Sequence, residues 1–273
     1  MRTGTFKTAA IVGAVCLAVF SANASASVNG IRAANNEIGA SVVDSLFNYQ
    51  ENIKSQAADT ESGWQPGFGI DGSYMGKFWG LHNIYMETHF GYTSGSVEYM
   101  GSLSNGALYN GTDNATTYRV LGRLGKGYTV GRSSMLTPYI TGGFQHWNRD
   151  LTGPYGYTED YSAGLVGAGV KYQYEITPRW IVGANGNVMA VVGGQMTPSV
   201  YNGVLGTASF DTSGEEDVGV STDYRISGPL HVFGGVHLTH FNYTGGKPNY
   251  GFREPSSQTN QFNVDAGVAY SFY

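Results

Sequence analysis

The sequence predicts an all-β protein, a transmembrane antiparallel β-barrel in which about ten strands follow one another up and down. The first observation is the last stretch of the chain, residues 260–273, where apolar and polar residues alternate strictly. Its apolar face consists of Phe262, Val264, Ala266, Val268, Tyr270 and Phe272. Such alternation is typical of a strand with one apolar side, and a tilted strand needs about 9–11 residues to cross a membrane.

The composition is the second observation. Aromatic residues make up 14% of the chain, 41 of its 273 residues are glycine, and 13% are charged. A soluble domain has about 25% charged residues. This composition favours a barrel with an apolar outer band. The alternative is a soluble secreted barrel such as a lipocalin, which buries its apolar face inward.

The third observation is the alternation of long and short connections, as in membrane barrels with long extracellular loops and short periplasmic turns. The predicted strands are residues 37–49, with a β-bulge at 42–44, 67–75, 81–93, 118–124, 136–147, 161–174, 180–192, 218–226, 230–242 and 260–273. Polar segments rich in glycine predict long loops at 50–65, 94–116, 149–157, 193–216 and 241–258. Short turns are expected at 76–77, 131–134, 177–178 and 227–229.

Aromatic residues stand at both ends of these strands. Beside the short turns lie Tyr74, Tyr174, Trp180, Tyr224 and Phe272, and beside the long loops lie Tyr92, Tyr118, Phe144 and Phe262. Amphipathic rings favour the boundary between membrane and water. The sequence therefore predicts two aromatic girdles, one at each membrane surface.

Residues 1–26 have the pattern of a secretory signal peptide. Arg2 and Lys7 form a basic start, an apolar core covers residues 9–20, and small residues precede cleavage after Ala24 or Ala26. Residues 27–36 are a predicted periplasmic lead-in, and residues 37–273 form the barrel. The single cysteine lies in the signal peptide, so no disulfide is expected. The net charge of −5 gives no reason to expect nucleic acid as a partner.

The segments 136–139 (Leu-Thr-Pro-Tyr) and 142–147 (Gly-Gly-Phe-Gln-His-Trp) resemble a recurring strand of small barrels in the OmpA-like and opacity-protein superfamily. The terminal strand resembles the insertion signal of bacterial outer-membrane β-barrels, carried here by Phe262, Val264, Val268, Tyr270 and Phe272. The resemblance implies the outer membrane of a Gram-negative bacterium. It also implies contact with outer-membrane lipid and lipopolysaccharide, and with periplasmic chaperones and the barrel-assembly machinery during insertion.

Charged residues on the predicted inward face are Asp71, Glu87, His89, Arg119, Arg123, Lys171, Asp223, Arg225 and Asp265. In a narrow barrel such charges must pair, so the first interpretation is a lumen network of ion pairs that fills the barrel, with Glu87 and Arg119 as the expected pair. The alternative is a hydrated path lined by Arg119 and Arg123.

A second candidate site lies at the predicted loop rim, where Glu215, Glu216 and Asp217 approach His237 and His240. A carboxylate beside a histidine suits the activation of water, which makes Asp217, His240 and His237 weak catalytic candidates. The architecture resembles that of the omptin proteases, but their Asp-x-Asp and Asp-x-His pairs are absent from the sequence. Nucleophile-elbow, zinc-protease and phosphate-loop motifs are absent too, so no cofactor or metal is expected.

The predicted loops contain tyrosines among small polar residues, which is a composition suited to an external ligand: Tyr99, Tyr109, Tyr155, Tyr157, Tyr201 and Tyr250. The sequence therefore predicts a non-enzymatic surface protein, a structural barrel whose loops make external or host contacts. The alternatives are a narrow passive porin-like channel and a rim hydrolase that acts on peptides or lipid A.

Overall fold

The computed structural model describes residues 28–52, 59–103, 105–200, 205–246 and 253–273. The predicted signal peptide and two of the loop tyrosines, Tyr201 and Tyr250, lie outside the described residues.

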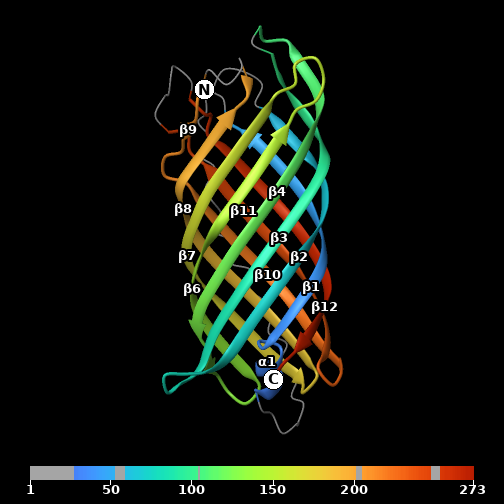
Figure 1. Cartoon of the computed structure of the whole chain (residues 1–273), viewed down its shortest axis with the longest axis vertical. Helices are drawn as coiled ribbons and strands as arrows, with labels where there is room; N and C mark the ends of the chain where they lie inside the picture. Colours follow the sequence, from blue (N-terminus) through green and yellow to red (C-terminus); the bar gives the residue numbers. More distant parts are fainter. Residues whose placement is uncertain (1–27, 53–58, 104, 201–204, 247–252) are drawn as a thin grey trace, which may run out of the picture.

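The chain forms a closed antiparallel barrel of ten long strands, as the alternation predicts (Figure 1). The long strands are β1 (Glu37–Glu51), β2 (Thr60–Phe78), β3 (Leu81–Ser102), β4 (Leu108–Lys126), β6 (Ser134–Asp150), β7 (Thr158–Thr177), β8 (Trp180–Pro198), β10 (Gly214–Ser227), β11 (Leu230–Tyr243) and β12 (Ser257–Ser271). Each pairs with its neighbours in chain order, and β1 pairs with β12 to close the barrel. The short strands β5 (Tyr128–Thr129) and β9 (Ala208–Ser209) pair with β6 and β8.

The two ends of the barrel differ, and we name them by their connections. The turn end carries two-residue turns at 79–80, 178–179 and 228–229, and the C-terminus lies there too (Figure 1). In the first of these turns Trp79 and Gly80 both have positive φ, 47° and 82°, which is the requirement of a type I′ hairpin turn. The opposite end, which we call the loop end, carries the longer connections.

Large apolar side chains are exposed on the outer face between the two ends, as expected for a lipid-facing band. Examples from around the barrel are Ile70, Val120, Ile140, Val166, Val188, Val220 and Val268. Among the described residues, no helix has the length and apolar content needed to cross a bilayer.

The strands extend farther toward the loop end than predicted. Residues 94–116, predicted as one loop, belong largely to the β3–β4 hairpin, which turns within residues 103–107. The other four predicted loops are also shorter, because strand pairing continues into them. Beyond the membrane the outer face no longer needs apolar residues, so the polar composition of a strand there resembles that of a loop.

The predicted bulge in β1 is wrong. The register of β1 with both neighbouring strands is continuous. Ile38 and Val42 point outward, with 59% and 70% exposure, whereas Phe47 and Tyr49 point inward and are buried. The apolar residues change face because the strand passes from the lipid band into an aromatic core at the loop end.

The predicted lead-in contains a short helix, α1 (Asn29–Ala33), which lies inside the turn end of the barrel (Figure 1). Ile31 is fully buried in an apolar cluster with Val28, Ala34, Met75, Tyr85, Met135 and Ile181. The Gly30 amide donates to Glu175 at 3.0 Å, and Asn35 donates to Gln173 at 2.7 Å. The helix therefore packs as a plug rather than as a free lead-in.

Candidate functional site

A cavity of about 300 Å³ occupies the barrel interior. Eight of the nine predicted lumen residues line it: Asp71, Glu87, His89, Arg119, Arg123, Lys171, Asp223 and Asp265. Arg225 is the exception among the residues predicted there. Near the end of β10, it donates to the Pro178 carbonyl at 3.2 Å in the adjacent turn.

The expected pair of Glu87 and Arg119 is wrong. Register places Glu87 opposite Arg123 and places Gly91 opposite Arg119. Arg123 donates to Glu87 at 2.6 Å, and the Lys171 ammonium lies 3.5 Å from the other Glu87 oxygen. Arg119 instead donates to Glu215 of β10, so this ion pair crosses the lumen.

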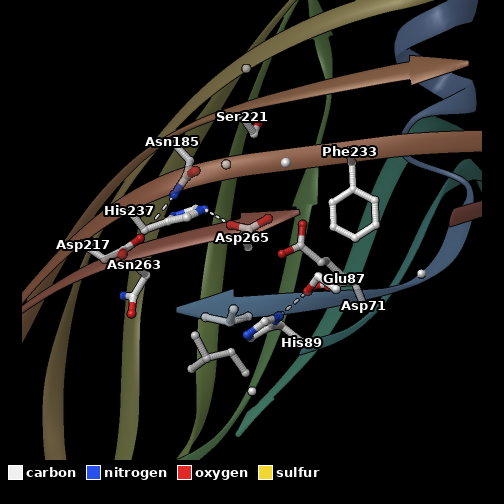
Figure 2. A pocket seen from close by; sticks show the side chains of 18 of the residues that line it. Asp71, Glu87, His89, Asn185, Asp217, Ser221, Phe233, His237, Asn263 and Asp265 are labelled. Atoms are coloured by element: carbon white, nitrogen blue, oxygen red, sulfur yellow. Dashed lines mark hydrogen bonds and ion pairs between the residues drawn. The ribbon is translucent and has the colours of Figure 1, made fainter. Parts of the chain in front are cut away.

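Two histidines of the cavity wall face aspartates on neighbouring strands (Figure 2). His89 Nδ1 lies 2.7 Å from Asp71 Oδ1, and His237 Nε2 lies 3.7 Å from Asp265 Oδ1. A histidine oriented by a carboxylate can act as a general base when substrate reaches it. These pairs lie inside the barrel and not at an open rim.

The catalytic pairing predicted for Asp217 and His240 is wrong, because the two side chains lie on opposite faces of the sheet. Asp217 points inward and accepts hydrogen bonds from three side chains at 3.1–3.3 Å, those of Asn185, Asn187 and Thr239. His240 is exposed on the outer face, opposite Glu216, and its Nδ1 lies 2.8 Å from Asn260 Oδ1.

An arginine-centred cluster fills the loop end. Arg149 is buried and donates to Glu61 and Glu159, and the carboxylates of Asp113 and Glu51 lie 3.7 and 3.9 Å from it. Its guanidinium also lies 4.8 Å from the centre of the Tyr49 ring and 5.4 Å from the centre of the Trp147 ring. Attraction between a cation and a ring face adds to the ion pairing.

An aromatic core surrounds this cluster: Phe47, Tyr49, Trp147, Tyr161, Met196, Phe241 and Tyr243. The sequence offered one signal of it, since Gln145, Trp147 and Arg149 alternate with polar outward residues. The sequence does not predict the cluster, because Arg149 falls in the loop expected at residues 149–157, whereas β6 extends to Asp150.

The carboxyls of this cluster lie beyond the lipid-facing band. Burial raises the pKa of Glu61 to about 8 and that of Glu51 to about 7, although Arg149 opposes both shifts. Burial and the nearby charges of Glu159 and Glu51 raise the pKa of Glu254 well above its usual range. Glu254 accepts a hydrogen bond from the Tyr161 hydroxyl at 2.6 Å. Burial therefore favours the protonated form of these acids.

No protein family model matches the sequence, and no curated protein matches it. Among solved structures, the outer membrane protease OmpT from Escherichia coli is similar, with a TM-score of 0.55 at 10% identity over 87% of this chain and 97% of that one. The transport unit of the autotransporter AIDA-I from Escherichia coli is similar at a TM-score of 0.47 and 9% identity, covering 86% of this chain and 90% of that one. The attachment invasion locus protein Ail of Yersinia pestis gives a TM-score of 0.34 at 10% identity over 86% of this chain and 99% of that one. The fold is that of a ten-stranded outer-membrane β-barrel, as the alternating strands predict.

Proposed function

We propose that this protein is a non-enzymatic surface barrel of the Gram-negative outer membrane, with a closed lumen and external contacts made at its loop end. The observation that supports this most directly is that both ends of the lumen are filled with packed side chains. The exposed apolar band supports contact with outer-membrane lipid and lipopolysaccharide. Export by residues 1–26, and insertion through chaperones and the assembly machinery, belong to the same proposal.

The turn end is filled by α1. Its apolar side chains pack on the barrel wall, and the polar groups of the segment that follows it are paired, as in the two hydrogen bonds that Asn36 makes with the Met75 backbone at 2.9 and 3.1 Å. Buried polar groups satisfied in this way hold a segment in one position. A path for ions through this end would require the helix to leave.

The loop end is filled by the aromatic core and by the Arg149 cluster. Trp147 and Tyr161 have 1% exposure each, and their ring centroids lie 4.6 Å apart. The core extends across the barrel, since Tyr161 also stacks with Tyr243 at 6.0 Å. Together the two fillings favour a structural role over the porin-like alternative.

The β3–β4 hairpin supports external contact. Its tip exposes Met100 and Leu108, at 57% and 78%. Beside it, Tyr109 contacts the exposed Tyr155 in an edge-to-face pair at 5.5 Å. Exposed apolar groups on a polar surface are typical of interaction sites.

The first test is electrical. We expect the folded protein in a planar bilayer to give no discrete current steps, while a porin of known conductance in the same bilayer does. Folding of the protein added to the bilayer is verified by the heat-dependent gel mobility of folded barrels. Reproducible steps with an ion selectivity that changes in Arg119→Gln would contradict the proposal and favour the channel.

The second test addresses the surface. Cells that display the double variant Met100→Ser, Leu108→Ser are expected to bind a host-cell monolayer at least about fivefold more weakly than wild type, since roughly 1 kcal/mol of lost apolar contact already gives that factor. Trp79→Ser is the matched control, because Trp79 is 91% exposed at the opposite end. Equal binding by all three proteins would remove the support for contact at this hairpin.

A further inference from the structure

We propose that Glu37, Asp223 and His231 form a binding site for a divalent zinc ion at the turn end of the lumen. One ligand atom from each residue lies within 4.8 Å of the other two. Among the residues that the structure describes, this is the group of three that meets the geometry of a metal site. Sequence spacing could not reveal it, because the ligands come from β1, β10 and β11.

The barrel register brings these ligands together. Ala269 of β12 pairs with His231 on one side and with Gly39 on the other. Glu37 lies two residues before Gly39 and therefore points to the same, inner face. The small inward side chain of Ala269 leaves room for the carboxylate to approach the imidazole across β12. On the other side of β11, Asp223 reaches the same imidazole from β10.

The distances suit zinc. His231 Nδ1 lies 2.7 Å from Asp223 Oδ1 and 3.6 Å from Glu37 Oε2. Ligand atoms about 2.0–2.2 Å from a tetrahedral zinc are roughly 3.4 Å apart. Glu37 Oε2 is already near that distance from His231 Nδ1. Asp223 Oδ1 would have to move away from His231 Nδ1 by less than about 1 Å to reach it.

Unpartnered buried atoms provide the second, independent observation. Glu37 Oε2, which lies 3.6 Å from His231 Nδ1, is buried and has no hydrogen-bond partner among the described residues. Asp223 Oδ2 is buried without a hydrogen-bond partner there as well, and the His231 side chain between the two carboxylates is 2% exposed. Two carboxylates around one imidazole leave excess negative charge in a buried site, and this charge is costly unless a bound cation or a proton neutralises it.

The donor set selects the metal. Zinc is bound by imidazole nitrogen and by carboxylate oxygen, and its open sites have three protein ligands, whereas calcium and magnesium prefer six or more oxygen ligands or retained waters. Glu37 and Asp223 both line the cavity. The fourth position therefore faces the cavity, where a water molecule would complete the coordination.

The lumen contains a natural comparison for this site. Asp71 and His89 make a contact of the same length, 2.7 Å, but both side chains are 35% exposed, and no third ligand stands with them among the described residues. Zinc should bind at the three-ligand site and not at the pair of Asp71 and His89. His89→Gln is therefore the matched control for His231→Gln.

The test uses the folded barrel in detergent micelles. Protein refolded with zinc chloride is passed through a desalting column, and its zinc content is measured by mass spectrometry. We expect about one zinc per chain for wild type, His89→Gln and His240→Gln, and at least tenfold less for His231→Gln and Asp223→Asn. Equal zinc content in wild type and His231→Gln would overturn the proposal.

A second measurement needs no variant and so remains decisive if the variants fail to fold. Cobalt(II) in place of zinc should give the visible absorption of a tetrahedral site, and the chelator EDTA should abolish it. Zinc should also raise the midpoint of heat-induced unfolding of wild type, because a ligand that binds only the folded state stabilises it. Calcium at the same concentration should not. Absence of both the absorption and the zinc-specific shift would refute the site.

Discussion

Replacing Arg149 with methionine tests the electrostatics of the loop end. The substitution keeps an unbranched side chain of similar length in the aromatic core but removes the cation that contacts Glu61, Glu159, Glu51 and Asp113. At least one further carboxyl must then become protonated, because an uncompensated buried charge costs about 3–5 kcal/mol.

The magnitude depends on pH. The ordinary pKa of a glutamate carboxyl is 4.5. Each pH unit above the pKa adds about 1.36 kcal/mol to the cost of protonating a carboxyl. Protonating one such carboxyl therefore costs about 3 kcal/mol at pH 7 and less than about 1 kcal/mol at pH 5. We therefore expect Arg149→Met to lower the free energy of unfolding by about 3 kcal/mol at pH 7. Most of that loss should disappear at pH 5.

The assay is urea unfolding in lipid vesicles, followed by tryptophan fluorescence, since Trp147 belongs to the same core. Arg132→Met is the control, because Arg132 is exposed near the turn end and its charge should be worth less than about 1 kcal/mol. The double variant Arg149→Met, Glu159→Gln should recover stability at pH 7. A loss below about 1 kcal/mol at pH 7, or one equal at both pH values, would refute the reasoning.

Three further predictions follow from contacts described above or from close backbone approaches. Because the pKa of Glu61 is raised to about 8 in the folded state, from 4.5 when unfolded, its contribution is fully present below pH 4.5 and is lost as pH rises through 8. Wild type should thus have a lower urea midpoint at pH 9 than at pH 5, and Glu61→Gln should reduce that difference. Glu87→Gln leaves two lumen cations without their carboxylate, so urea titration should show a loss of about 3–5 kcal/mol, whereas Glu98→Gln, at an exposed position, should show little change. A Cβ added at Gly67 would lie 1.8 Å from a backbone oxygen of β3, but one at Gly72 would meet its nearest atom at 3.4 Å. Gly67→Ala should therefore reduce the yield of heat-resistant folded barrel, and equal yields from the two alanine variants would contradict this.

Residue alternation was enough to predict the barrel, because lipid imposes a period of two on every strand that crosses it. The terminal strand shows this most clearly, since Val264, Val268 and Tyr270 are exposed on the outer face as expected. Beyond the lipid band this constraint ends. Residues 94–102 and 108–116 are paired strand although their composition resembles a loop.

The lumen residues could be assigned to a face from sequence, but their partners could not. Which carboxylate meets Arg123 depends on the register between two strands, and a shift of a few residues would exchange Glu87 for another group. Contacts between strands that do not pair with each other are even harder to predict from sequence. The contacts of Arg119 with Glu215 and of His231 with Glu37 depend on the circumference and stagger of the closed sheet.

The plug segment and the last strand, which closes the barrel, are joined by hydrogen bonds, and this has a consequence for assembly. Ser271, near the end of β12, donates through its hydroxyl to the carbonyls of Ala33 and Asn36 at 3.1 Å each, and the Phe272 amide donates to Asn36 at 2.9 Å. These hydrogen bonds exist only when the segment that follows the helix and the end of β12 are both in place. A barrel with an extruded helix should therefore lack them, and the end of β12 should then be more accessible to proteases.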